Sequence, residues 1–117
     1  MISRRHVLAA AILMLAPAAA LAHHGWGSYD ASKTMTVEGP IAASQFENPH
    51  ALIKVNAAGK TWTIVLAPTS RMVARGATAE LVAVGKSVVA VGYASTAVAD
   101  EMRAERITID GKTVELR

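Results

Sequence analysis

The feature that most constrains this chain is a series of short stretches in which apolar and polar residues alternate, separated by turn residues. Alternation with a period of two is typical of strands that bury one face. It appears in residues 34–46, in both halves of 51–67, in 86–93 and in both halves of 104–116. The dipeptides Ala58-Gly59 and Asp110-Gly111 favour tight turns that would fold two of these stretches into hairpins. The sequence therefore predicts an all-β domain.

A single helical pattern interrupts the strands after Pro68. Thr69 or Ser70 can cap a short helix that runs through Arg75, and Gly76 can end it. Five main strands with a helix between the third and the fourth is the layout of the OB-fold, a small, partly open Greek-key barrel. An immunoglobulin-like sandwich would have about seven strands and no central helix.

We therefore predict an all-β fold with one short helix, a five-stranded OB-fold-like Greek-key barrel, over residues 34–117. Gly39-Pro40 interrupts the first strand, where we expect a bulge or an edge because proline donates no ladder hydrogen bond. Six side chains are expected to be mostly buried in the barrel: Trp62, Ile64, Leu66, Val89, Val91 and Ile107.

Residues 1–22 have the three parts of a secretory signal. Arg4 and Arg5 form a basic start, "VLAAAILMLAPAAALA" is apolar, and Ala20-Leu21-Ala22 ends with small residues at the positions that a signal peptidase reads. The apolar run is shorter than the roughly 20 residues that span a membrane. We predict cleavage after Ala22, a periplasmic protein and no stable membrane span afterwards. "SRRHVL" resembles the twin-arginine export pattern without its usual following lysine, so the general secretory route is favoured.

Cleavage would leave a chain of 95 residues (117 less 22), which begins with an arm over residues 23–33. It would also change the charge balance. Ten of the 12 lysines and arginines would remain against all 9 acids, a net charge near +1 with no basic run. Nucleic-acid binding usually needs a concentrated basic face, so we expect no nucleic-acid partner. The absence of cysteine excludes disulfides, thiolate metal sites and thiol nucleophiles.

Several segments carry a resemblance that spans residues 22–117. They are "AHHGWGSYD", "ENPH", "KTWTIVLAPTSRM", "RG", "VGYAST" and the closing "MRAERITIDGKTVELR". In these the chain resembles the domain of unknown function 6152 family of small exported bacterial proteins. The resemblance implies export and a small β-rich domain. It implies no activity, since the family has none assigned.

Three histidines would remain after cleavage, and His23 would be the first residue. A terminal histidine can bind a metal through its amine and its ring, and His24 or His50 can add a further imidazole. Planar nitrogen ligation suits Cu(II), which also leads the affinity order of the divalent first-row metals. The first hypothesis is therefore a periplasmic metal-binding or carrier protein for copper, with His23, His24 and His50 as its ligands. Oxygen from Tyr29, Asp30 or Glu47 would serve as an axial or outer ligand.

Chain length permits this site. The arm spans at most about 36 to 40 Å when extended, and the first strand rises about 3.3 Å per residue. An arm folded back beside that strand would reach His50. The site resembles that of histidine-brace copper proteins in its terminal histidine alone.

The alternative is a metal-free OB-type module that binds a small molecule, a glycan or a periplasmic partner protein. Its aromatic contacts would be Trp26, Tyr29, Trp62 and Tyr93, because aromatic faces stack on flat or apolar ligands. Trp26 and Tyr29 can instead pin the arm over an open barrel end. The sequence has no Gly-rich phosphate loop, no G-x-S-x-G and no H-E-x-x-H, and we expect no enzyme.

Overall fold

The structure, a computed structural model, describes residues 25–117. The predicted signal segment and the candidate ligands His23 and His24 lie outside these residues. The described chain begins with a short 3-10 helix, η2, and continues through six strands and one α-helix. In chain order the elements are η2 (Trp26–Ser28), β1 (Met35–Gln45), β2 (Leu52–Ala57), β3 (Lys60–Val65), α2 (Thr69–Ala74), β4 (Ser87–Ala94), β5 (Glu101–Ile109) and β6 (Lys112–Glu115).

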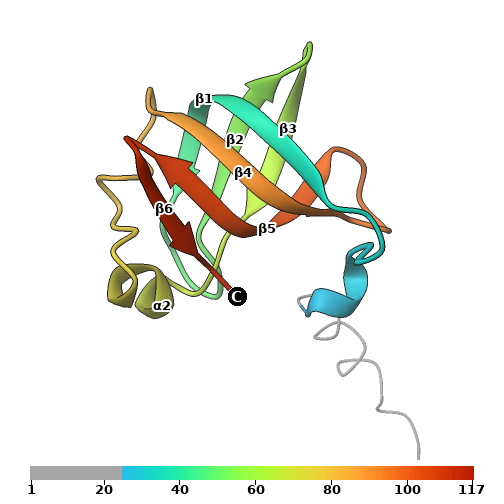
Figure 1. Cartoon of the computed structure of the whole chain (residues 1–117), viewed down its shortest axis with the longest axis horizontal. Helices are drawn as coiled ribbons and strands as arrows, with labels where there is room; N and C mark the ends of the chain where they lie inside the picture. The colour runs from blue at the N-terminus through green and yellow to red at the C-terminus, as the bar shows by residue number, and fades with distance from the viewer. Residues whose placement is uncertain (1–24) are drawn as a thin grey trace, which may run out of the picture.

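The strands form one sheet that closes on itself (Figure 1). Its order is β3-β2-β1-β4-β5-β6, and a parallel pairing of β3 with β5 joins the two ends of the five-stranded ring. In this pairing Ile64 lies beside Met102. β6 pairs with β5 alone and extends it as a hairpin. The predicted OB-like barrel, with one short helix between β3 and β4, is confirmed.

The first strand takes part in both halves of the barrel. Residues 35–40 of β1 pair with β4, and residues 41–45 pair with β2, with a shift of register between Ile41 and Ala43. The interruption expected at Gly39-Pro40 thus lies at the point where β1 changes partners. A Cβ atom on Gly39 would lie 2.2 Å from the carbonyl oxygen of Asn56. Glycine is therefore required for β2 to pass this closely.

Both predicted hairpin turns are present. Ala58 and Gly59 have positive φ angles of 52° and 79° between β2 and β3, and Asp110 and Gly111 have 54° and 76° between β5 and β6. Two successive residues with positive φ form the turn whose twist matches that of paired strands. The helix also ends as expected, with Gly76 at a φ of +90°. Its N-cap is Pro68 rather than Thr69 or Ser70, and no side chain caps it.

The barrel interior is apolar. Its fully buried side chains include Ile41, Ile53, Val55, Ile64, Leu66, Met72, Val88, Met102, Ile107, Ile109 and Leu116. Ile64, Leu66 and Ile107 were expected there, whereas Trp62 is partly buried and packs against the edge of this core.

The core-facing phase of β4 differs from the expected one. Val88 and Ala90 are completely buried, while Val89 and Val91, which were expected in the core, are partly buried. The stretch is apolar in both phases, so alternation alone does not decide which side faces inward. Pairing with β1 decides it, because Val88 lies opposite Gly39 and Val89 opposite the exposed Glu38.

The helix and the chain end are joined. Met72 of α2 is buried in the core, while Arg71 donates to the carbonyl of Leu116 at 3.2 Å and Arg75 to that of Glu115 at 2.9 Å. The C-terminus consequently lies between α2 and η2 (Figure 1). This position brings Arg117 to the N-terminal arm.

Candidate functional site

The N-terminal arm is fastened to the outside of the barrel by Trp26. Two guanidinium groups lie over its indole, that of Arg103 at 4.2 Å and that of Arg117 at 4.6 Å from the ring centroid. The rings of Tyr29 and Tyr93 meet it edge-on, at centroid distances of 6.4 Å and 6.0 Å. Cation–π and edge-to-face contacts each favour such an arrangement. These contacts hold Trp26, and with it the arm, against Arg103 of β5 and Arg117 at the C-terminus.

Backbone pairing continues the attachment. Tyr29 forms an antiparallel bridge with Ser95, and the amide of Thr96 donates to the carbonyl of Ser28 at 2.9 Å. The arm thus lies against the loop between β4 and β5. It forms one wall of the space beneath that loop.

Arg103 of β5 is the one charged residue among the buried side chains of residues 25–117, with 5% of its surface exposed. It lies under Trp26, and its Nη2 is 3.3 Å from Nε2 of His50. Burial is the main cause that lowers the pKa of Arg103, and the charges of Arg71 and Arg117 act in the same direction. An arginine remains charged despite such a shift. His50 thus has a cation as its neighbour.

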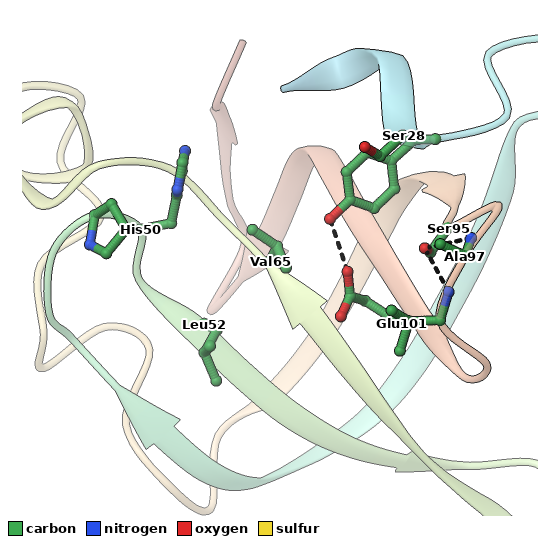
Figure 2. Close-up of a pocket in the computed structure, with 10 residues that line it drawn as sticks. Ser28, His50, Leu52, Val65, Ser95, Ala97 and Glu101 are labelled. Carbon is green, nitrogen blue, oxygen red and sulfur yellow. Dashed lines mark hydrogen bonds between the residues drawn. The ribbon is translucent and has the colours of Figure 1, made fainter. Parts of the chain in front are cut away.

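A pocket of about 520 Å³ opens beside this arm at the rim of the barrel (Figure 2). Its walls come from the arm, from the β1–β2 loop, from the ends of β2 and β3, and from the β4–β5 loop with the start of β5. The lining residues are Ser28, Tyr29, Pro49, His50, Leu52, Val65, Ser95, Ala97, Val98 and Glu101.

The lining combines apolar walls with a few polar groups. Leu52 and Val65, which are paired across β2 and β3, lie between His50 and Glu101 in Figure 2. The Tyr29 hydroxyl donates to Oε2 of Glu101 at 2.8 Å. Burial and this hydrogen bond raise the pKa of Tyr29 well above its usual range, so its hydroxyl remains a donor.

The β4–β5 loop is ordered by its own hydrogen bonds. The Ser95 hydroxyl oxygen accepts from the amides of Ala97 and Val98, at 3.1 Å and 3.0 Å. Val98 nevertheless keeps 52% of its surface exposed. An apolar side chain is thus held at the mouth of the pocket.

Of the predicted metal ligands, the structure describes one. His50 lines the pocket together with Tyr29. Asp30 accepts hydrogen bonds from the hydroxyl of Ser32 at 2.5 Å and from its amide at 3.0 Å, and these two bonds lower the pKa of Asp30. Glu47 is exposed on the β1–β2 loop and lines another hollow beside α2. Within residues 25–117 no three histidine or acidic side chains form a group that could hold a metal ion.

The four candidate aromatic residues separate into two places. Trp26, Tyr29 and Tyr93 gather around Arg103, whereas Trp62 lies on β3 with the Lys60 ammonium group 5.3 Å from its ring. Among the four, Tyr29 lines the pocket. Trp26 and Tyr93 contact each other and do not line the pocket.

Sequence reasoning missed most of the pocket. Glu101 looks ordinary in the sequence, and Leu52 and Val65 read as strand residues. The predicted fold itself carried the available signal, since OB-folds bind ligands on the face of strands 2 and 3, between the β1–β2 and β4–β5 loops. The pocket lies at that place.

A comparison with protein families identifies the family to which this chain belongs. A family model described as "Family of unknown function (DUF6152)" matches residues 11–113. The chain belongs to the DUF6152 family. The resemblance carried by its sequence motifs is thereby confirmed. A comparison with curated proteins found no match.

Solved structures similar to this DUF6152 protein support the fold. One is the S. pombe Stn1–Ten1 complex, with a TM-score of 0.54 and 17% identity, covering 65% of this chain and 57% of that chain. Another is the TiaS–tRNA(Ile2)–ATP complex, with a TM-score of 0.50 and 16% identity, covering 76% of this chain and 20% of that one. The DUF6152 chain thus spans less than two thirds of either neighbour. Among residues 25–117, no helix has the length and apolar character needed to cross a membrane.

Proposed function

We propose that this DUF6152 protein is an exported binding module that holds a small, largely apolar organic molecule in the pocket between its β1–β2 and β4–β5 loops. The observation that carries the proposal is the position of that pocket. It lies at the rim of the barrel, where Leu52 at the start of β2 and Val65 at the end of β3 line it between the two loops. In OB-folds the face of strands 2 and 3 and the two adjoining loops bind oligonucleotides and oligosaccharides, so the position of the pocket indicates a ligand site and its lining indicates the kind of ligand.

The size and the chemistry of the pocket support the proposal independently of the fold. Small-molecule sites typically have volumes of about 300 to 1,000 Å³, with apolar walls and a few polar groups that fix orientation. This pocket has about 520 Å³. Pro49, Leu52, Val65 and Val98 supply apolar surface, and the polar groups come from Ser28, Tyr29, His50, Ser95 and Glu101.

A neutral apolar dye tests the proposal. N-phenyl-1-naphthylamine should gain fluorescence on binding to the purified protein. Val65→Trp, which fills the pocket, should abolish the gain. Val65→Thr keeps the shape of the side chain but adds a hydroxyl group, and it should weaken binding by about three- to tenfold. Circular dichroism establishes that both variants are folded.

Val84→Thr is the matched control, because Val84 is 63% exposed and does not line the pocket. It should bind the dye as the parent protein does. The proposal is wrong if the parent gives no signal, or if folded Val65→Trp binds as well as the parent.

Copper binding by His23, His24 and His50 is a second candidate. The position of the arm supports this candidate, because Trp26 lies over Arg103, and Nη2 of Arg103 lies 3.3 Å from Nε2 of His50. The chain that follows His23 and His24 is therefore fastened close to His50. The Arg103 guanidinium opposes it, because a neighbouring positive charge disfavours a metal cation on that imidazole.

A further inference from the structure

Among the residues that line the pocket, Glu101 is the one acidic side chain. It lies on the wall of the pocket, is partly buried, and accepts one hydrogen bond from Tyr29. Across residues 25–117 the salt bridges join Asp100, Asp110, Glu105 and Glu115 to lysine or arginine, and none includes Glu101.

Glu105 provides an internal comparison. It is four residues further along β5, is also partly buried, and also accepts a hydrogen bond from a tyrosine hydroxyl, that of Tyr93. Glu105 is neutralised by Arg106 at 3.3 Å and by Arg117 at 3.5 Å. Glu101 has a tyrosine in the same role, but its open side faces the pocket instead of an arginine.

We infer that the pocket selects an organic cation, an amine with an apolar body whose ammonium group pairs with Glu101 while the body lies over Leu52 and Val65. The inference rests on the proposed function, because it assigns the charge of the ligand that the same pocket holds. A carboxylate in a partly desolvated site forms charge-assisted hydrogen bonds about twice as strong as neutral ones. The Tyr29 ring, which also lines the pocket, adds a cation–π attraction.

The charges around the pocket also orient the ligand. His50 lies at the end away from Glu101 in Figure 2, and Arg103 stands beside it. The guanidinium charge repels an ammonium group at that end. The cationic group of the ligand is thus directed to Glu101, and its apolar body toward His50.

Three compounds of one shape test the inference. They are 4-tert-butylbenzylamine, which is a cation at pH 7, the neutral 4-tert-butylbenzyl alcohol and the anionic 4-tert-butylbenzoate. Each is titrated calorimetrically into the purified protein and competed against N-phenyl-1-naphthylamine. The amine should bind about tenfold more tightly than the alcohol, and the benzoate should bind most weakly.

Two matched variants locate the effect. Glu101→Gln keeps an oxygen that accepts from Tyr29 but removes the charge, and it should reduce the amine to the affinity of the alcohol. Glu80→Gln removes the same charge from an exposed residue outside the pocket and should leave the tenfold preference intact.

The outcomes separate the inference from the proposed function. If the dye binds but the three compounds compete equally, or if Glu101→Gln retains the preference, the inference is wrong and the pocket proposal stands. Amine binding that persists in Val65→Trp places the amine elsewhere and also overturns the inference. If neither the dye nor any compound binds, both proposals are wrong.

Discussion

The guanidinium group of Arg103 lies 4.2 Å from the centroid of the Trp26 indole, and this contact buries a charge on the outer side of the barrel. Arg103 is on β5, between Met102 and Ala104, which both face the core. It is buried because the N-terminal arm lies over it. The same arm supplies Ser28 and Tyr29 to the pocket, so the stability of the arm and the shape of the pocket are coupled.

Replacing Trp26 with alanine should release the arm. The loss of two cation–π contacts and two aromatic edge contacts should lower the free energy of unfolding by about 1 to 3 kcal/mol. Hydrogen exchange gives a local measurement, because the Thr96 amide donates to Ser28 of the arm. That amide should exchange faster, while the amide of Ile64 in β3 remains protected.

Lys60→Ala, which removes a cation from Trp62 instead, should leave Thr96 protected. Unchanged exchange at Thr96 in Trp26→Ala would show that Trp26 does not hold the arm.

Because the Tyr29 hydroxyl donates to Glu101 in the folded state, the free energy of unfolding should fall at alkaline pH. The folded-state pKa of Tyr29 is raised, chiefly by burial. Its contribution is therefore fully present below the unfolded pKa of about 10 and is lost as pH rises beyond it, because the unfolded chain releases the proton first. Tyr29→Phe should be about 0.5 to 1.5 kcal/mol less stable than the parent near pH 8. This difference should shrink above pH 10.

Urea unfolding at several pH values measures that difference. Tyr93→Phe removes the hydroxyl that donates to Glu105 and should leave the alkaline loss due to Tyr29 in place. A constant difference between the parent and Tyr29→Phe from pH 8 to 11 would contradict the prediction.

The copper proposal predicts that Cu(II) affinity changes with the residue at which the protein begins. A protein that starts at His23 should bind Cu(II) through its amine, whereas a protein with one extra residue before His23 should bind it more weakly. The amine and the imidazoles must lose protons, with ordinary pKa values of about 7.7 to 8.0 and 6.5, so affinity should rise from about pH 5 to 8. His50→Ala should remove part of the affinity. Calorimetric titration of the three proteins measures this, and equal binding by all three would exclude the terminal histidine as a ligand.

The local parts of the fold were predictable because they depend on neighbouring residues. Ala58-Gly59 and Asp110-Gly111 adopt the positive φ angles that tight hairpins need, and Gly76 ends the helix in the same way. The order of strands and helix then indicated the barrel. The inward phase of β4 was not predictable, since Val88 and Val89 are equally apolar and pairing with β1 selects between them.

What the sequence by itself determined was the OB-like barrel, its turns and its membership of the DUF6152 family. Only the tertiary structure decided the pocket. Leu52, Val65 and Glu101 belong to three different strands, and the parallel pairing of β3 with β5 brings them to one rim. The arm then closes the wall through Tyr29. Strand residues are selected first for alternation and burial, so their sequence pattern is the same whether or not they border a cavity. The long-range pairings give Glu101 a pocket to face, whereas Glu105 pairs with the adjacent Arg106 and with Arg117.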